Sequence, residues 1–277
     1  MSRAEEIRYL NSLTVEEVIE KAGSHLKIFE DVNGIDRFLA DVMFEKLTNK
    51  DTNSLIFPYG PIGQYPFLIE MLNNRKKPIR AKKIFFMDEY ADASGADFPE
   101  DHPLSFKGRT MHYFGKIDRS ILPDPSIIVF PSSTNYKNIV SMIKQNEGID
   151  ICIGGIGIHG HMAFNEPSKG VRYTDPYLVE LNAYTVTINA IRESVGGDVY
   201  NFPTKAYTLG MNQLLSSREI MLSCRNGLKE IDWANTVLRI ALFGEAGDDF
   251  PVTYLRTHDN YIILTDKETL KTPINRL

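Results

Sequence analysis

The chain has 277 residues, a formal charge of −5 and 43% hydrophobic residues, values that exclude a disordered chain, a collagen-like repeat and a coiled coil. Its apolar runs are far shorter than the ~20 residues that span a bilayer, and its first residues lack the pattern of a signal peptide. Two cysteines indicate a reduced setting, and the mild acidity argues against nucleic-acid binding. We therefore expect a single domain over residues 1–277, located in the cytoplasm, with no membrane or nucleic-acid partner.

Helical patterns alternate with short apolar runs along the chain. Thr14 and Glu17 form a capping box that predicts a helix to about residue 22. The apolar runs are rich in β-branched or aromatic residues, as are the central strands of a parallel sheet. In chain order we then expect a helix at 34–47, a strand at 54–58, a helix at 65–73, strands at 83–87 and 127–130, a helix at 135–146, strands at 149–153, 206–209 and 219–223, a helix at 228–243 and a strand at 261–265. The alternation predicts an α/β fold with a mainly parallel sheet flanked by helices, in which sites form at the carboxyl ends of the strands.

Two adjacent acids, Asp88 and Glu89, follow the strand expected at 83–87. Carboxylates at a strand end serve as a general base, as metal ligands or as a helix N-cap. Because neighbouring side chains tend to point apart, we expect one acid to line a pocket while the other pairs elsewhere. A solvated turn capped by Asp88 is an equally good explanation of the pair at this point.

A glycine-rich segment with several titratable side chains follows the strand expected at 149–153. It reads Gly-Gly-Ile-Gly-Ile-His-Gly-His-Met-Ala-Phe-Asn-Glu-Pro over 154–167. Glycines such as Gly155 and Gly157 let the backbone approach a ligand closely, and histidine titrates near neutral pH, as proton transfer requires. A turn with incidental histidines is the plainer alternative, but titratable groups gathered at a strand end favour a functional site.

The same segment contains a formal match to the dinucleotide-binding pattern G-x-G-x-x-G, at Gly155, Gly157 and Gly160. That pattern requires a long helix that opens at the third glycine. Pro167 follows within seven residues and argues against such a helix. The match therefore gives only weak support to a nicotinamide cofactor.

A zinc site is the other alternative for this segment. His159 and His161 are two residues apart, and such a pair chelates Zn²⁺ when both side chains lie on one face of a strand. The glycine between them disfavours a regular strand, and a third ligand would have to come from Asp88, His102 or elsewhere.

Three motifs together resemble the glucosamine-6-phosphate deaminase (isomerase) family. They are Met-Asp-Glu-Tyr at 87–90, Asp-His-Pro-Leu-Ser-Phe at 101–106 and the glycine-rich segment at 154–167. The resemblance implies a modified Rossmann-like α/β domain that converts glucosamine 6-phosphate and water to fructose 6-phosphate and ammonium. It also implies that a small sugar phosphate is the partner and that no metal or organic cofactor takes part.

The resemblance assigns roles to individual residues. Asp88 matches the general base, which moves a proton between C2 and C1 of the open-chain sugar, and a carboxylate suits this work. Glu89 and Tyr90 match its neighbours in substrate binding. His161 matches the histidine that assists ring opening, and Glu166 matches the acid that acts with that histidine.

Arg192 and Lys229 fall near the two phosphate-binding cations of the family. Arginine suits bidentate phosphate binding, whereas lysine acts as a point charge. The plainer interpretation of both is an exposed surface cation.

The chain departs from the family pattern at His159, where the family has an aspartate two residues before the ring-opening histidine. Such a carboxylate would hold the imidazole in one tautomer and stabilise its charged form. With a histidine in its place, we expect His161 to protonate less readily, one of the two histidines to stay neutral, and the pair to titrate as a coupled unit. The change bears directly on ring opening by the family route.

A second departure lies in the loop after the strand expected at 54–58. The family reads roughly Pro-Thr-Gly-Gly-Thr-Pro here, a turn whose N–H groups cradle phosphate, whereas this chain has Pro-Tyr-Gly-Pro-Ile-Gly-Gln-Tyr-Pro at 58–66. Pro61 has no N–H to donate, while Gly60, Gly63 and the start of the following helix still offer a place for an anion. We expect weaker phosphate binding, or a substrate that carries a different group.

These observations favour a glucosamine-6-phosphate deaminase-like enzyme. The alternatives are a relative that acts on a different amino sugar or sugar acid, and a sugar-binding protein without turnover, because fold alone does not fix function. The sequence leaves a monomer and a homo-oligomer both open.

Overall fold

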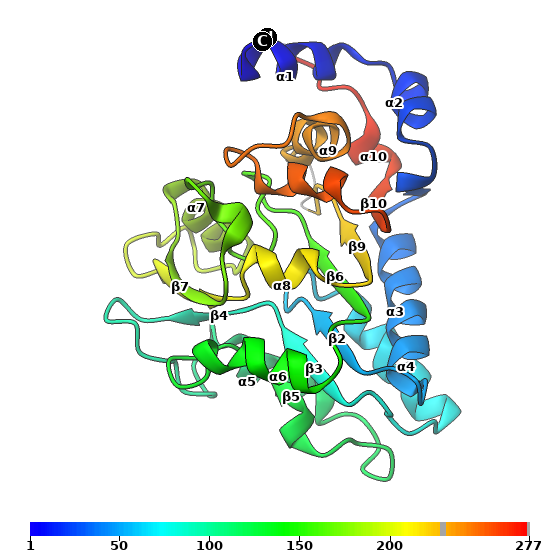
Figure 1. The fold of residues 1–277 in the computed structure, drawn as a ribbon, viewed down its shortest axis with the longest axis vertical. Helices are drawn as coiled ribbons and strands as arrows, with labels where there is room; N and C mark the ends of the chain where they lie inside the picture. Colours follow the sequence, from blue (N-terminus) through cyan, green and yellow to red (C-terminus); the bar gives the residue numbers. More distant parts are fainter. Residues whose placement is uncertain (228–230, 276–277) are drawn as a thin grey trace.

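The computed structural model describes residues 1–227 and 231–275 of the chain (Figure 1). Within these residues, seven parallel strands form a main sheet in the order β1-β10-β9-β6-β2-β3-β5, and three antiparallel strands form a smaller sheet in the order β4-β8-β7. The strands of the main sheet are β1 (Leu26–Phe29), β2 (Ser54–Phe57), β3 (Lys83–Phe86), β5 (Ile128–Val129), β6 (Ile151–Gly155), β9 (Glu219–Ser223) and β10 (Tyr261–Asp266). Those of the smaller sheet are β4 (Asp88–Ala91), β7 (Tyr177–Glu180) and β8 (Lys205–Thr208).

Helices cover both faces of the main sheet. The α-helices are α1 (Arg3–Ser12), α2 (Val15–Ala22), α3 (Val32–Thr48), α4 (Gln64–Arg75), α5 (Phe106–Phe114), α6 (Ile139–Gln145), α7 (Ala183–Arg192), α8 (Met211–Leu215), α9 (Ala234–Phe243) and α10 (Lys267–Leu270). Helices α3, α4, α5 and α7 and the smaller sheet share one apolar cluster, and α1, α2, α6, α8 and α9 share the other. In Figure 1, α3 and α4 lie side by side along one border of the molecule.

The central strand β2 shows how the sheet separates these two clusters. Ile56 pairs with Phe85 of β3 on one side and with Cys152 of β6 on the other. Successive side chains of a strand point to opposite faces, and Leu55 and Phe57 accordingly join one cluster while Ile56 joins the other. All three side chains are fully buried, which accounts for the uninterrupted apolar run that the sequence shows here.

The expected α/β fold with a mainly parallel sheet is confirmed. The strands expected at 54–58, 83–87, 127–130, 149–153, 219–223 and 261–265 correspond to β2, β3, β5, β6, β9 and β10. The Thr14–Glu17 capping box is also present: the Thr14 hydroxyl accepts from the Glu17 N–H, and the Glu17 carboxylate accepts from the Thr14 N–H. Of the helix expected at 228–243, residues 234–243 form α9, and residues 228–230 lie outside the described residues.

The run at 206–209 is a correction to the expectation of a single parallel sheet. It belongs to β8, which pairs antiparallel with β4 and β7 in the smaller sheet. Because β8 is the central strand of that sheet and is covered on both faces, its composition resembles that of a parallel core strand. The sequence pattern also missed β1, β4 and β7; β4 begins with Asp88 and Glu89, whose charges conceal a buried strand.

The segment after β6 contains no helix before residue 171. Its backbone turns tightly instead: the Gly157 N–H donates to the His161 carbonyl, and the Gly160 N–H donates to the Gly157 carbonyl. Gly160 adopts a φ of +63°, in the left-handed region that favours glycine. The helix that dinucleotide binding needs at this position is therefore not formed.

Candidate active site

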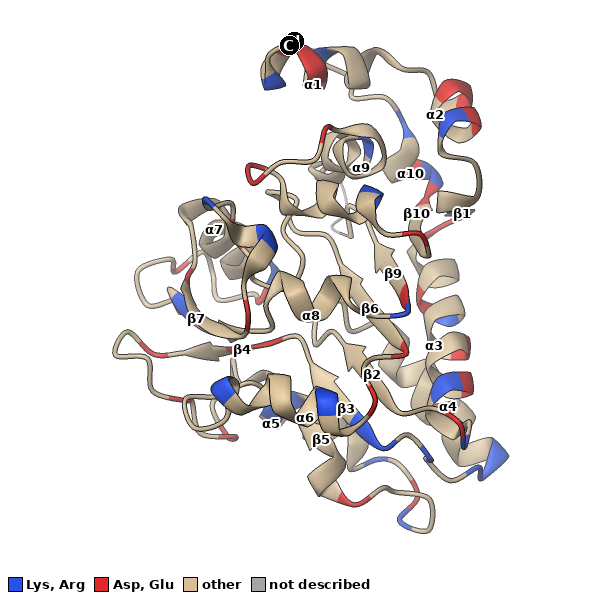
Figure 2. Ribbon diagram, viewed as in Figure 1, with Lys and Arg blue, Asp and Glu red and all other residues tan. Residues whose placement is uncertain are grey.

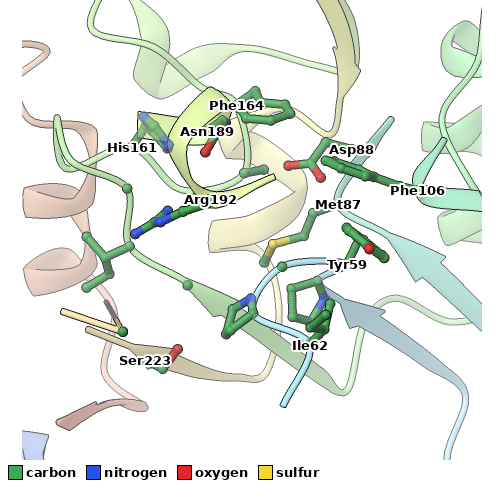
Figure 3. Close-up of a pocket in the computed structure, with 18 of the residues that line it drawn as sticks. Tyr59, Ile62, Met87, Asp88, Phe106, His161, Phe164, Asn189, Arg192 and Ser223 are labelled. Carbon is green, nitrogen blue, oxygen red and sulfur yellow. The ribbon is translucent and has the colours of Figure 1, made fainter. Parts of the chain in front are cut away.

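A cavity of about 340 Å³ opens at the carboxyl ends of β2, β3, β6 and β9 (Figure 3). Its walls come from the loop after β2, the junction of β3 and β4, the glycine-rich segment after β6, the end of α7 and the segment after β9. Seven of the residues singled out in the sequence line this cavity: Gly60, Asp88, Tyr90, Gly155, Gly157, His161 and Arg192. The strand ends therefore gather these residues, as expected for a parallel sheet.

Asp88 faces the cavity from the first position of β4 (Figure 3). Its side chain is buried, and burial together with the charge of Glu89 raises the pKa of Asp88 to about 8 from its ordinary value of 3.8. Around it lie apolar walls that include Met87, Phe106 and Phe164. A carboxyl group in this setting exchanges its proton near neutral pH, as a general acid or base requires.

Glu89 points away from the cavity and holds the start of α5. Its carboxylate accepts hydrogen bonds from the Phe106 N–H at 2.8 Å, from the Lys107 N–H at 2.7 Å and from the Tyr90 N–H at 2.9 Å. Burial raises the pKa of Glu89, and these hydrogen bonds oppose that effect. The two adjacent acids thus point apart, and Glu89 positions the helix that carries Phe106 and Arg109 to the cavity.

His161 is held at the cavity wall by close packing against Gly157. A Cβ atom on residue 157 would lie only 1.8 Å from His161 Nε2, so any side chain there would displace the imidazole. On the opposite side of the ring, His161 Nδ1 lies 3.4 Å from Glu166 Oε2 and 3.5 Å from Thr185 Oγ1. Nδ1 therefore faces the carboxylate, while Nε2 lies against the backbone that lines the cavity.

Glu166 does not line the cavity but orients His161 from behind. Its carboxylate accepts from the Asn182 N–H at 3.2 Å and from Asn182 Nδ2 at 2.6 Å. Burial would raise the pKa of Glu166, but His161, Thr185 and Asn182 stabilise the charged form, and the pKa of Glu166 lies below its ordinary value. The acid therefore stays ionised beside the imidazole.

Asn182 also fixes His159 outside the cavity. Its Nδ2 lies 3.0 Å from His159 Nδ1, and its Oδ1 caps α7 by accepting from two backbone N–H groups. The ring of His159 lies 4.3 Å from that of Tyr184. Burial lowers the pKa of His159, with a smaller contribution from His161, and Glu166 acts in the opposite direction. This direction agrees with the expectation that one of the two histidines stays neutral.

Three guanidinium groups line the cavity. Arg109 pairs with Glu193 at 2.5 Å and lies over the Tyr59 ring at 5.0 Å from its centroid. Arg192 lies 4.5 Å from the centroid of the Trp233 ring. Arg192 is exposed as a whole residue, yet desolvation and the charge of Arg225 lower its pKa to about 10, so it stays charged at pH 7. Lys229, expected to act with Arg192, lies outside the described residues.

The loop after β2 closes one side of the cavity with rings and few donors. Tyr59 stacks on Phe106 with 4.4 Å between ring centroids. Pro61 packs against Gly155, where a Cβ would lie 3.1 Å from its Cδ. Gly63 does not line the cavity: it precedes α4, and a Cβ there would lie 1.9 Å from Asp36 Oδ2.

Charged side chains are distributed unevenly over the molecule. Figure 2 shows both signs of charge spread over the outer helices and loops, while the strands of the main sheet are largely uncharged.

The described residues contain no group of three or more histidine, cysteine, aspartate and glutamate side chains placed to hold a metal ion. In the part of the chain that the structure describes, no helix is long and apolar enough to cross a bilayer.

Sequence reasoning missed several residues that line the cavity. Asn189 and Glu193 lie at the end of α7, and Arg109 lies on α5, in helices that the sequence pattern did not predict. Arg225 and Asn226 lie two and three residues after β9, so the rule that selected Asp88 after β3 would have found them as well.

Comparison with known proteins identifies the family. A glucosamine-6-phosphate deaminase from Caenorhabditis elegans is 32% identical over 208 residues, which cover 71% of this chain and 74% of the relative. The chain belongs to the glucosamine-6-phosphate deaminase family. A deaminase from Halalkalibacterium halodurans is 27% identical over 250 residues, which cover 89% of this chain and 97% of the relative. No protein-family model matches the chain.

Solved structures show the same fold in this and neighbouring families. A monomeric glucosamine-6-phosphate deaminase, described as a missing link of the NagB superfamily, matches 88% of this chain and 98% of its own length with a TM-score of 0.75 and 23% identity. A 6-phosphogluconolactonase from Thermotoga maritima matches 87% of this chain and 99% of its own length with a TM-score of 0.56 and 18% identity. The deaminase family thus shares its Rossmann-like architecture with lactonases, and the reaction has to be argued from the site.

Proposed function

We propose that the protein converts glucosamine 6-phosphate and water to fructose 6-phosphate and ammonium. We also propose that it does so in the cytoplasm, as a single domain, with no metal or organic cofactor. The observation that carries the proposal is that Asp88, His161 and Arg192 line one cavity. These side chains provide a proton acceptor with a raised pKa, a histidine and a cation, which suit an amino-sugar phosphate.

Ring opening is the first step and uses His161. The bond between C1 and the ring oxygen breaks, the ring oxygen gains a proton, and the hydroxyl on C1 loses one as it becomes a carbonyl oxygen. With Nδ1 turned toward Glu166, Nε2 is the nitrogen available to carry a proton at the ring oxygen. Glu166 is ionised, and its carboxylate fixes the side of the ring that carries Nδ1.

Isomerisation is the second step and uses Asp88. The carboxylate takes the proton from C2 of the open-chain sugar, the carbonyl oxygen on C1 gains a proton from water, and an enol with nitrogen on C2 forms. The proton on Asp88 then moves to C1, which leaves a protonated imine at C2. Water adds to C2, and the nitrogen leaves as ammonium to give the ketose. Burial makes the Asp88 carboxylate a stronger base than an exposed one, because its pKa lies at about 8.

One assay tests the proposal. Purified protein with glucosamine 6-phosphate should release ammonia and fructose 6-phosphate in equal amounts, and Asp88→Asn should reduce the rate by at least ~100-fold, as expected for loss of a general base. Asp101→Asn, at an exposed aspartate outside the cavity, is the matched control and should keep the wild-type rate.

Absence of ammonia release would reject the deaminase reaction. If hydrolysis of a sugar-acid lactone phosphate or release of ammonia from another amino sugar is found instead, the protein is a relative with a different substrate. If sugar phosphates raise the unfolding temperature and none is converted, the protein is a binding protein without turnover.

A further inference from the structure

Arg225 is a cavity cation with unused hydrogen-bonding capacity. It follows β9 by two residues, and its side chain is 15% exposed. Its Nη2 lies 3.5 Å from Asp36 Oδ1, and its Nε is buried with no hydrogen-bond partner among the described residues. A guanidinium has five N–H donors, and buried donors are usually paired. The Arg225 side chain forms no hydrogen bond to another described residue, and because Nε is enclosed, the Nη groups are the donors left for a ligand in the cavity that Arg225 lines.

Arg192 reaches the same cavity from α7 and is close enough for the two charges to interact. Desolvation is the first cause of the lowered pKa of Arg192, and the charge of Arg225 is the second. Glu193, the residue after α7, opposes the lowering of the Arg192 pKa through its charge, but it also forms an ion pair with Arg109. Asp36 pairs with Arg225. Three arginines thus line the cavity against the two acids Asp88 and Glu193, and an excess of positive charge faces it.

The loop after β2 offers little to an anion. Pro58 and Pro61 have no N–H, and Pro61 covers the backbone at Gly155. The start of α4, where a helix N-terminus would receive an anion, already has a carboxylate beside it: Asp36 Oδ2 would lie 1.9 Å from a Cβ on Gly63. An anionic ligand therefore has better partners on the opposite side, at the arginines.

We propose that Arg225, together with Arg192, binds the phosphate group of the substrate, and that Asp36 positions Arg225 for this contact. The identity of the sugar rests on the proposed function, whereas the anion site rests on the two guanidinium groups. Guanidinium groups bind phosphate through two parallel N–H···O bonds. These donors would take the place of the backbone N–H groups that the prolines of the loop after β2 lack. Recognition of the anion thus depends less on the loop after β2 and more on side chains, with Arg225 after β9 added to Arg192 on α7.

Binding of inorganic phosphate and of fructose 6-phosphate, measured by calorimetry at two salt concentrations, tests the proposal. Arg225→Gln should raise both Kd values about tenfold or more, the loss expected for one charge-assisted hydrogen-bonding pair. It should also weaken the dependence of Kd on salt, because one charge has left the site. Arg225→Lys should recover part of the affinity, and Arg119→Gln, at an exposed arginine outside the cavity, should change nothing.

A second variant guards against misfolding. Arg225→Gln leaves Asp36 buried without its partner, and Asp36→Asn combined with Arg225→Gln removes both charges together. The double variant should lose phosphate binding to the same extent. Phosphate affinity within twofold of the wild type in a folded single or double variant, or no phosphate binding by the wild type, would overturn the role of Arg225.

The binding assay does not depend on turnover. If the wild type releases no ammonia but Arg225→Gln weakens phosphate binding, the proposed function fails and the anion site stands. If the wild type releases ammonia and Arg225→Gln binds phosphate normally, only the role of Arg225 fails. In an active protein, Arg225→Gln should raise KM for glucosamine 6-phosphate more than it lowers kcat, as expected when binding to substrate and transition state is lost equally.

Discussion

Replacement of Asp88 by asparagine should stabilise the protein while it removes the proton acceptor. Burial, with the charge of Glu89, raises the pKa of Asp88 to about 8 from 3.8. One pKa unit corresponds to about 1.4 kcal/mol, so ionisation of Asp88 costs the folded state at most about 6 kcal/mol. This is a large part of the ~5–15 kcal/mol that stabilises a typical domain.

The free-energy cost of burying Asp88 grows as pH rises. The unfolded chain releases the Asp88 proton near pH 4, whereas the folded protein keeps it until about pH 8. Between these values the unfolded state binds fewer protons, so this residue makes the free energy of unfolding fall as pH rises, and the effect levels off above pH 8. Asparagine has no proton to lose. The stability advantage of Asp88→Asn should therefore grow by about 4 kcal/mol between pH 5 and pH 8.

Urea unfolding of the wild type and of Asp88→Asn at pH 5, 6.5 and 8 measures this difference, with Asp101→Asn as the exposed control. The reasoning is refuted if the two free energies of unfolding differ by the same amount at all three pH values. If the free-energy advantage of Asp88→Asn over the wild type becomes smaller as pH rises, the folded environment favours the charged form of Asp88, the opposite of what burial predicts.

Two further predictions concern the histidines. Gly157→Ala should lower kcat by about 100-fold without unfolding the protein, because the new Cβ would lie 1.8 Å from His161 Nε2 and misplaced catalytic groups reduce rates by this order. Gly115→Ala, at the end of α5, is the control. Normal turnover by Gly157→Ala would show that the position of His161 is not critical. His159 should titrate with a midpoint below pH 6.5 in NMR spectra, because burial lowers its pKa. Its signals are assigned by their loss in His159→Gln. A midpoint above pH 6.5 would show that the opposing charge of Glu166 prevails.

The central strands and the principal site residues follow from the sequence because both depend on local patterns. β2, β3, β6 and β9 are buried on both faces, so each forms an apolar run that is visible without a structure. Asp88 and His161 lie just after such runs, and the carboxyl ends of parallel strands meet at one edge of the sheet. The pattern therefore predicted that these two side chains lie near one site.

The parts that the sequence does not predict depend on contacts between distant segments. Glu89 binds the start of a helix 17 residues further along the chain, and nothing in the motif distinguishes it from Asp88 as the acid that faces the cavity. Asp36 and Arg225 are separated by most of the chain and pair only when α3 and β9 lie near each other. The role of Gly63 also depends on a residue that is distant in the sequence: its lack of a side chain makes room for Asp36 and not for a substrate.

The replacement at His159 is compatible with ring opening because another residue orients the imidazole. An aspartate at this position would serve to hold Nδ1 of His161, but Glu166 already lies 3.4 Å from that nitrogen. Glu166 is itself fixed by two hydrogen bonds from Asn182, and the same Asn182 side chain meets His159 Nδ1 at 3.0 Å. His159 is thus connected to the site through a neutral amide and, when uncharged, leaves the negative charge of Glu166 beside His161. In the proposed reaction, ring opening then depends on Glu166, and the altered loop after β2 is the larger difference from the family.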